Sequence, residues 1–215
     1  MAPPATAATP RRKRRATTEV TGLLIEAATE EFKRFGYASA TTASIARRAG
    51  ATEAQLFRYF GSKADLFRES VFNQLDRHFA EFNAQHLVED AAIDDVRTLA
   101  RLYITELQRF LSQHSELMLS LFVAQTYGPE VSPGVHEIAS LQAYFRRGTA
   151  LVENTVAVGS RRIDARLLVR ISFAAVLANV MFKGWLFPPG LASESEIGDA
   201  VIDFVIDGIG VNASA

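Results

Sequence analysis

The sequence contains no cysteine, which excludes disulfide bonds and any thiolate that acts as a nucleophile or metal ligand. This absence is typical of proteins of the reducing cytoplasm. Long apolar runs are also missing: the longest, at 171–182, has twelve residues, too few to span a bilayer, and indicates a buried helix. The basic residues within 1–15 precede no apolar stretch, which does not fit a secretory signal. We therefore expect a cytoplasmic protein with no membrane partner.

Residues that commonly carry catalysis or bind metals are sparse as well. The four histidines, His78, His86, His114 and His136, are scattered without metal-ligand spacing. No Ser-His-Asp pattern and no glycine-rich phosphate loop accompanies them. The sequence therefore predicts no catalytic residue, no metal ion and no cofactor, and it favours a protein that is not an enzyme.

The sequence does contain ample apolar material and an uneven distribution of charge. Apolar residues make up 48% of the 215 residues and include 15 Phe, enough to bury a substantial core. The net charge is −1, but residues 10–63 hold eleven Lys or Arg against five Asp or Glu, whereas the rest holds twelve against nineteen. A basic N-terminal quarter on an acidic body predicts a polyanionic partner for that part alone.

Residues 1–16 are predicted to form a disordered basic arm. Residues 1–10 are rich in Ala, Pro and Thr, and Arg11–Arg15 is an uninterrupted run of five cations. This run is either a solvated tail or a flexible arm that follows DNA phosphates or enters a minor groove.

Apolar periodicity predicts a first helix from about Thr18 to Gly36. Gly36 is expected to end it, because glycine is favoured in the left-handed conformation of a helix C-cap. A later helix, capped by Ser62 with Asp65 at its third position, runs to about residue 86. Between these two lies a segment with the signals of two further, shorter helices.

The two short helices lie on either side of residues 50–52. Thr41 is the expected N-cap of the first, and Thr52 caps the second with Gln55 three residues later in a capping-box arrangement. Each helix is too short to be stable alone, so the pair predicts an αα corner.

The rest of the chain has the same helical character. Helices are expected at about 94–114, 116–127, 135–158, 164–187 and 193–209. Asp164 is the predicted N-cap of the fourth of these, and Ser193 with Glu196 forms a capping box for the last. Neither strand alternation nor an internal repeat is present, so the predicted fold class is all-α.

An ordered series of residues marks the segment from Leu24 to Leu66. Its members are Ala27, Ala28, Phe32, Gly36, Tyr37, Thr41, Thr42, Ile45, Ala46, Ala49, Gly50, Leu56–Phe60 and Ser62–Leu66. In this spacing, the segment resembles the DNA-binding domain of the tetracycline-repressor (TetR) family. The resemblance implies about nine helices, with a helix-turn-helix domain at 17–66 and a helical ligand-sensing and dimerisation domain at 67–215.

A helix-turn-helix places the N-terminus of its second helix in the major groove of double-stranded DNA. The first turn of that helix would here consist of Thr52, Glu53, Ala54 and Gln55. Ala54 allows close approach to a thymine methyl, Gln55 can pair with adenine, and Glu53 can accept from cytosine. Alternatively, Gln55 only completes the cap and Glu53 only favours the helix dipole.

Contacts to DNA phosphates need only charge and reach. The resemblance implies them for Thr42, Tyr59 and Lys63. Arg47, Arg48 and Arg58 are further cationic candidates, each of which can also be simply solvated. Two positions depart from the family pattern. Phe57 replaces a frequent Tyr and is expected in the core, and Ser44 replaces a frequent acid, which weakens the cap at Thr41.

No motif encodes a ligand in the C-terminal part, but its surplus of large apolar side chains predicts an apolar small-molecule effector. Candidate pocket residues are Tyr103, Phe110, Met118, Phe122, Gln125, Tyr144, Phe145, Asn179 and Phe182. Ordinary core packing is the alternative for each aromatic residue. If buried, the Asn179 amide needs a partner, which can be a ligand, a helix carbonyl or Asn179 of a second subunit. The resemblance implies a homodimer formed through the last two helices.

These features predict a DNA-binding transcriptional regulator, and more specifically a ligand-responsive repressor that binds a palindromic operator as a homodimer. The alternative is a DNA-binding regulator controlled by a protein partner instead of a small molecule. The sequence does not encode the effector, the operator sequence or the choice between repression and activation.

Overall fold

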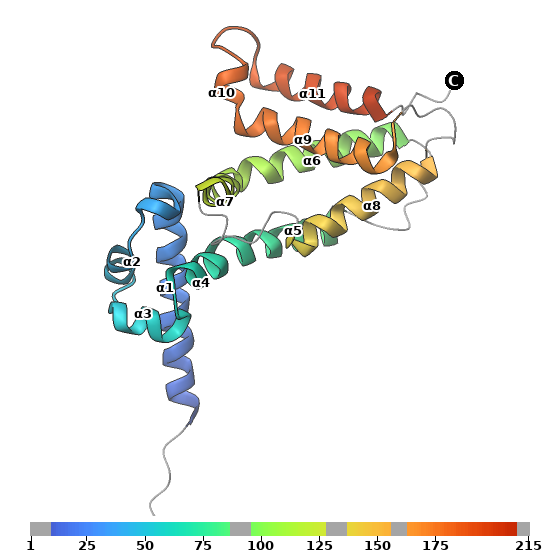
Figure 1. The fold of residues 1–215 in the computed structure, drawn as a ribbon. Helices are drawn as coiled ribbons and strands as arrows, with labels where there is room; N and C mark the ends of the chain where they lie inside the picture. The colour runs from blue at the N-terminus through green and yellow to red at the C-terminus, as the bar shows by residue number, and fades with distance from the viewer. Residues whose placement is uncertain (1–9, 87–95, 128–136, 156–162, 210–215) are drawn as a thin grey trace, which may run out of the picture. The chain divides into compact units, whose positions relative to one another are not determined.

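The computed structural model describes residues 10–86, 96–127, 137–155 and 163–209, and every regular element in these ranges is helical (Figure 1). This confirms the predicted all-α fold class. Close contacts divide the chain into two units. Of the described residues, the N-terminal unit holds 10–74 and 120–127, and the C-terminal unit holds the others.

The N-terminal unit is built from α1 (Pro10–Ser39), α2 (Thr42–Arg48), α3 (Glu53–Phe60) and α4 (Lys63–Phe67), with the second half of α7 (Ser115–Tyr127). Helix α1 begins earlier than predicted, so Arg11–Arg15 lies in its first turns and not in a disordered arm. Pro10 suits a first helical position, and the Arg, Lys and Ala residues after it are good helix formers. Residues 1–9 of the predicted arm lie outside the described residues.

The predicted N-caps at Thr41 and Ser62 are confirmed. The Thr41 hydroxyl accepts from the Ser44 amide at 3.1 Å, and the Ser62 hydroxyl accepts from the Asp65 amide at 3.0 Å. The backbone is left-handed at Gly36, with a φ of 70°, and this residue kinks α1 before its last turn. Because L side chains rarely adopt this conformation, the glycine is required there.

The core of the N-terminal unit joins α1 to the short helices. Fully buried side chains come from α1 (Leu24, Ala28, Phe32), α2 (Ile45), α3 (Leu56) and α4 (Leu66, Phe67). The Phe32 ring packs edge-on against Phe67, with ring centroids 5.0 Å apart. Helix α7 joins this core, because the Ser120 hydroxyl donates to the Phe32 carbonyl at 3.2 Å.

The predicted fourth helix is interrupted, and this is a correction to the sequence analysis. Helix α4 passes through a π turn, η1 (Arg68–Phe72), before α5 (Asn73–His86). The buried Thr29 hydroxyl of α1 donates to the Ser70 carbonyl at 3.1 Å and accepts from the Gln74 amide at 3.0 Å. These hydrogen bonds hold the π turn from outside, so local sequence periodicity does not reveal it.

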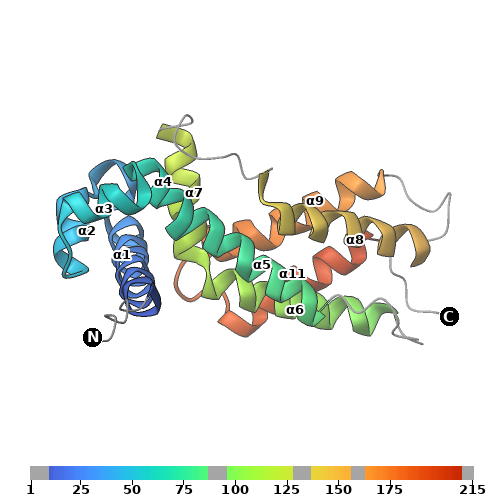
Figure 2. The same ribbon diagram turned by 90° about the horizontal axis from the view of Figure 1, so that it is seen from below.

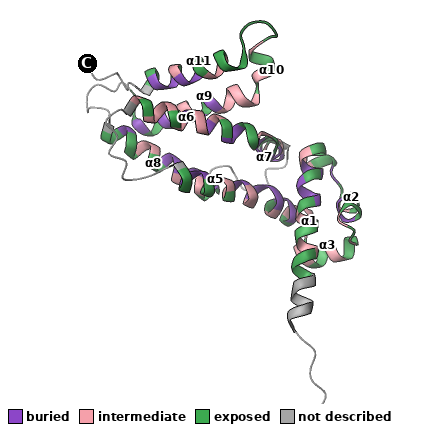
Figure 3. Cartoon of the chain, turned by 180° about the vertical axis from the view of Figure 1, so that it is seen from behind, coloured by how far each residue is buried: buried purple, intermediate pink, exposed green. Residues whose placement is uncertain are grey.

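The C-terminal unit contains α5 from Leu75 onward, α6 (Val96–Gln113), the first part of α7, α8 (Ala139–Thr155), α9 (Ala165–Met181), α10 (Lys183–Leu186) and α11 (Glu194–Ile209). Helix α9 packs against α6, α8 and α11 (Figure 2). Phe173 and Val176 are among its buried residues, whereas Leu167 and Ile171 are exposed. Figure 3 shows buried and exposed residues alternating along the helices of this unit.

The predicted helix at 164–187 also divides in two. Asp164 caps it as predicted, by accepting from the Arg166 amide at 2.8 Å. The backbone then leaves helical geometry at Phe182, with φ −117° and ψ 19°, and α10 follows. Gly184, a poor helix former, lies just beyond this break. The capping box of α11 is confirmed, because the Ser193 amide donates to the Glu196 carboxylate at 2.7 Å.

Ion pairs fasten α11 to α6. Arg97 lies 3.0 Å from the Asp207 carboxylate, and Arg101 pairs with Asp203 and lies 3.9 Å from Asp199.

Among the described helices, none is both long and apolar enough to cross a bilayer.

Candidate functional site

Helices α2 and α3 form a helix-turn-helix corner. The turn passes through Gly50, whose φ is 64°, and the Ala51 amide donates to the Ala46 carbonyl at 2.9 Å. Ile45 and Leu56 are fully buried, one on each helix, which holds the pair together. The corner therefore has the form that a DNA-reading helix requires.

The outward face of α3 carries Thr52, Glu53, Ala54, Phe57 and Arg58, all of them exposed. The first turn of α3 is thus accessible. Phe57 was predicted to lie in the core, and that prediction is wrong, because 45% of this residue is exposed. Neighbouring residues on a helix point about 100° apart, so burying Leu56 turns Phe57 toward the face shared by Glu53 and Ala54.

Gln55 is part of a complete capping box. Its Oε1 accepts from the Thr52 amide at 2.8 Å, and its own amide N–H donates to the Thr52 hydroxyl at 3.2 Å. Pairing with adenine through two hydrogen bonds needs both Oε1 and Nε2 of a glutamine. While the cap is formed, Gln55 therefore has only its Nε2 group to offer a base.

A hydrogen bond joins the N-terminal ends of the two helices. The Thr42 hydroxyl of α2 donates to the Glu53 carboxylate of α3 at 2.5 Å. This bond orients the Glu53 carboxylate, which can accept only from a base amino group. The hydroxyl proton of Thr42, a residue predicted to contact a phosphate, is therefore already used in this bond.

A buried carboxylate that the sequence analysis missed holds α2 on α1. Glu31 is only 6% exposed, and it accepts from the Ser44 hydroxyl at 2.8 Å and from Arg48 Nε at 2.9 Å. Arg48, predicted as a phosphate contact, is therefore first of all a partner of Glu31. The only sequence signal for the role of Glu31 was Ser44. This serine stands at a position where the family that the segment resembles often has an acid.

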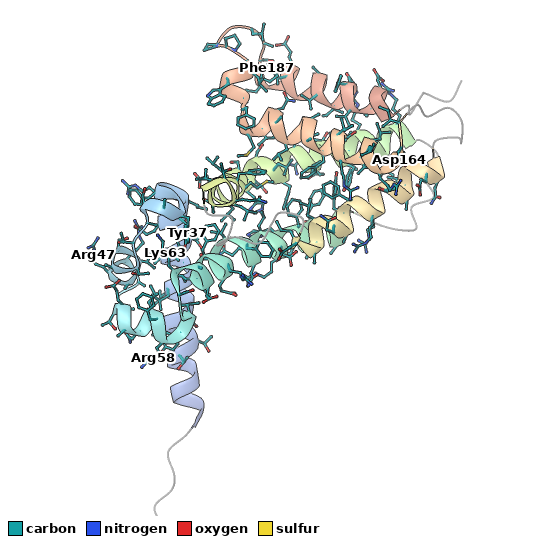
Figure 4. The ribbon with its side chains drawn as sticks, viewed as in Figure 1. Tyr37, Arg47, Arg58, Lys63, Asp164 and Phe187 are labelled. Carbon is teal, nitrogen blue, oxygen red and sulfur yellow. The ribbon has the colours of Figure 1, made fainter. Side chains whose placement is uncertain are left out.

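Three of the cations predicted to contact phosphates are Arg47, Arg58 and Lys63 (Figure 4). Arg47 is exposed at the end of α2. Arg58 donates to the Tyr59 hydroxyl at 2.9 Å, and its guanidinium carbon lies 4.8 Å from the centre of the Tyr59 ring. The Lys63 ammonium lies 4.5 Å from the centre of the Tyr37 ring at the start of α4, and partial burial lowers the pKa of this lysine. These positions fit contacts to an anionic backbone.

Four of the predicted ligand residues come together in the C-terminal unit. Tyr103 stacks on Tyr144, with ring centroids 5.8 Å apart, and Tyr144 and Phe145 lie 5.5 and 5.3 Å from Phe173. Phe110 joins them through Phe82. We call Phe79, Phe82, Tyr103, Phe110, Tyr144, Phe145 and Phe173 the aromatic cluster.

The other five predicted ligand residues lie outside the cluster. Met118 is buried at the start of α7, and Phe122 and Gln125 belong to the N-terminal unit. The Asn179 amide donates to the Ala175 carbonyl of its own helix at 2.8 Å, which is one of the three partners considered. Phe182 is 46% exposed and contacts Trp185.

A pocket of about 280 Å³ opens between α5 and α6 of the C-terminal unit. Its lining residues are His78, Glu81, Phe82, Gln85, Glu106, Arg109, Phe110, Gln113 and His114. The pocket is thus more polar than predicted, and Phe110 is its one predicted member. The His78 and His114 rings stack within it, 4.1 Å apart. No set of three or more His, Asp or Glu residues in the described ranges is arranged to hold a metal ion.

The N-terminal region is similar to a known family of proteins. Residues 24–70 match the sequence profile of the bacterial regulatory proteins of the tetR family. The sequence has no match among functionally curated proteins. The matching family consists of regulators and not of enzymes.

Solved structures share the fold at low sequence identity. A TetR-family regulator from Mesorhizobium loti is 17% identical, with a TM-score of 0.68, over 89% of this chain and 96% of the other. FadR from Bacillus subtilis, in complex with stearoyl-CoA, is 18% identical, with a TM-score of 0.65, over 87% and 98%. A transcriptional regulator from Saccharomonospora viridis, in complex with choline, is 18% identical, with a TM-score of 0.63, over 91% and 97%.

Proposed function

We propose that this protein is a TetR-family transcriptional regulator, and more specifically a ligand-responsive repressor that binds a palindromic operator as a homodimer, and the match of residues 24–70 to the tetR family supports this proposal. The proposal places it in the cytoplasm, where it meets double-stranded DNA. It has three parts, which are the reading of DNA, dimerisation and the response to a ligand.

The exposed first turn of α3 is the single observation that supports DNA reading most strongly. Thr52, Glu53 and Ala54 are exposed on a helix whose other side is anchored by the fully buried Leu56. The cations Arg47, Arg58 and Lys63 belong to the same unit and can neutralise phosphates on either side of the groove. Phe57 adds an exposed apolar ring to the reading face.

Dimerisation is supported by apolar side chains that the C-terminal unit leaves exposed. They are Leu167 and Ile171 of α9, Trp185 and Leu186 of α10, and Phe204 of α11, each more than half exposed. Such a surface is costly in water and is typical of an interface between subunits. A single reading helix spans too few base pairs for useful specificity, so a two-fold pair of subunits suits a palindromic site.

The aromatic cluster and the more polar pocket that adjoins it support a response to a small molecule with both apolar and polar groups. Proteins with this fold have been solved with stearoyl-CoA and with choline. Ligand binding that favours a state with misplaced reading helices by about 2.8 kcal/mol would weaken operator binding about a hundredfold. The alternative to a response to a small molecule is control by a protein partner.

The test starts with selection of duplexes from a random DNA pool by the full-length protein. Enrichment of a palindromic sequence is the expected result, and failure to enrich any sequence contradicts DNA reading. Candidate compounds are then titrated into the protein–operator complex. If none changes operator affinity, the ligand-responsive part fails and the protein-partner alternative replaces it.

A further inference from the structure

Glu53 places a negative charge on the helix face that the proposed function directs toward DNA. It is the first residue of α3 and is exposed. The ion pairs within the described part of the N-terminal unit join Lys33 to Glu30 and Arg48 to Glu31, so none of them offsets the Glu53 carboxylate. DNA phosphates repel such a charge, and this repulsion is offset where a base donates a hydrogen bond to the carboxylate.

The Thr42 hydroxyl fixes the direction of this carboxylate. It donates to Glu53 Oε1 at 2.5 Å and thereby joins the first residue of α2 to the first residue of α3. A long side chain loses rotamer freedom when it is ordered, and here the protein orders it before DNA binds. Since a carboxylate has about four acceptor sites, the bond from Thr42 leaves others for a base.

Cytosine is the base that suits a carboxylate best. In the major groove, amino groups are presented only by cytosine, through N4, and by adenine, through N6. Adenine also presents its N7 acceptor beside N6, and this lone pair repels a carboxylate. Cytosine presents no acceptor of its own in that groove, so its amino group is the favoured donor.

We propose that Thr42 is a positioning residue for base reading, which holds Glu53 so that its carboxylate accepts from N4 of one cytosine in each half of the operator. Thr42 then acts through Glu53 and not through a phosphate, the contact that the family resemblance implied for it. The inference rests on the proposed DNA reading and names one base of the target. Its rivals are a bond that only fastens α2 to α3 and an acid that only favours the helix dipole.

The test uses the full-length protein and the duplex that it enriches from a random pool. Each cytosine of one half-site is replaced in turn by N4-methylcytosine, which keeps the base pair and removes the amino proton that faces the major groove. At one cytosine, the replacement is expected to weaken wild-type binding about tenfold, because a hydrogen bond to a charged group is lost. The same replacement is expected to leave the affinity of Glu53→Ala unchanged.

Variants of Thr42 separate positioning from a merely structural bond. Thr42→Val removes the donor at similar volume and is expected to abolish most of the tenfold discrimination between the normal and the methylated operator, whereas Thr42→Ser keeps the donor and the discrimination. Thr126→Val is the matched control, because the Thr126 hydroxyl donates to the Phe122 carbonyl of its own helix at 2.9 Å, and full discrimination is expected. If Thr42→Val is less stable to urea but discriminates as the wild type does, the bond only fastens the two helices and the proposal is overturned.

Glu53→Gln tests the reading itself without loss of the acceptor for Thr42. Glutamine can pair with adenine through two hydrogen bonds, so the affinity ratio of adenine to cytosine at this position is expected to rise about tenfold. An unchanged ratio overturns the proposal, because Glu53 then acts only on the helix dipole.

Failure of this inference is distinct from failure of the proposed function. If the protein enriches no sequence, DNA reading fails, and the inference fails with it. If a palindromic sequence is enriched but every methylated cytosine affects wild type and Glu53→Ala alike, the repressor stands and the role of Thr42 and Glu53 fails.

Discussion

The buried carboxylate of Glu31 accepts a hydrogen bond from the Ser44 hydroxyl at 2.8 Å, and this bond connects α1 to α2, which packs against α3. Arg48 binds the other oxygen of the same carboxylate. The position of α2 thus depends on a charge that lies inside the N-terminal unit.

Replacement of Glu31 tests this connection. Glu31→Ala leaves Ser44 and Arg48 without their acceptor and is expected to lower the free energy of unfolding by about 1.5–3 kcal/mol, measured by urea denaturation. Glu30→Ala is the matched control, because the Glu30 side chain is 56% exposed and lies 3.8 Å from Lys33, and a change within about 0.5 kcal/mol is expected. Equal effects of the two substitutions would show that Glu31 does not hold α2.

Gln55→Ala is expected to have two separate effects. Loss of the hydrogen bond from the Thr52 amide to Gln55 Oε1 lowers the free energy of unfolding by about 0.5–1.5 kcal/mol. Loss of Nε2 as a donor costs about 1 kcal/mol of operator affinity and relaxes the preference at one base pair, measured by competition with operators altered at single positions. An equal loss on operator and random DNA would mean that Gln55 is only a cap, and a loss near 3 kcal/mol would mean that the cap opens for a bidentate contact.

Lys63→Ala is expected to weaken binding to all DNA sequences by the same factor. Because one phosphate contact releases about 0.9 counterion, the slope of log K against log salt concentration becomes shallower by about that amount. Lys183→Ala, in the C-terminal unit and paired with Glu194, is the control and leaves the slope unchanged. A Lys63→Ala effect confined to one base pair would contradict the phosphate contact.

The helix cap at Asp164 predicts a pH dependence. Hydrogen bonds from Arg166 lower the pKa of Asp164 to about 2 in the folded chain, from a usual value of 3.8. Because this folded-state pKa is depressed, the stabilisation is fully present above the usual value and is lost as the pH falls from 3.8 toward 2. A titration of the side-chain carboxyl carbon by NMR should show the low midpoint, and Arg166→Ala should return it toward the usual value. A wild-type midpoint at or above 3.8 would contradict the cap.

Helix starts were predictable because their signals are local. The caps at Thr41, Thr52, Ser62, Asp164 and Ser193 join a side chain to a backbone amide two or three residues ahead. Such a contact depends on residue type and spacing alone. The exposed first turn of α3 followed from the same signals.

Features set by distant contacts were not predictable. The π turn is held by Thr29, which lies 41 residues before Ser70. Phe57 looked like a core residue because it is apolar, but the direction in which α3 buries its face depends on how Leu56 meets the other helices. Only some of the predicted ligand residues lie in the aromatic cluster, for the same reason. An aromatic residue such as Phe182 has the same local sequence signal whether it is buried or exposed.

The central claim is that two subunits read one DNA site with their α3 helices. Hydroxyl-radical footprinting of the full-length protein on its enriched duplex tests this claim most directly. The account predicts two protected half-sites related by two-fold symmetry, with centres about 34 Å apart, one turn of B-form DNA. Protection of a single half-site by one subunit would contradict it.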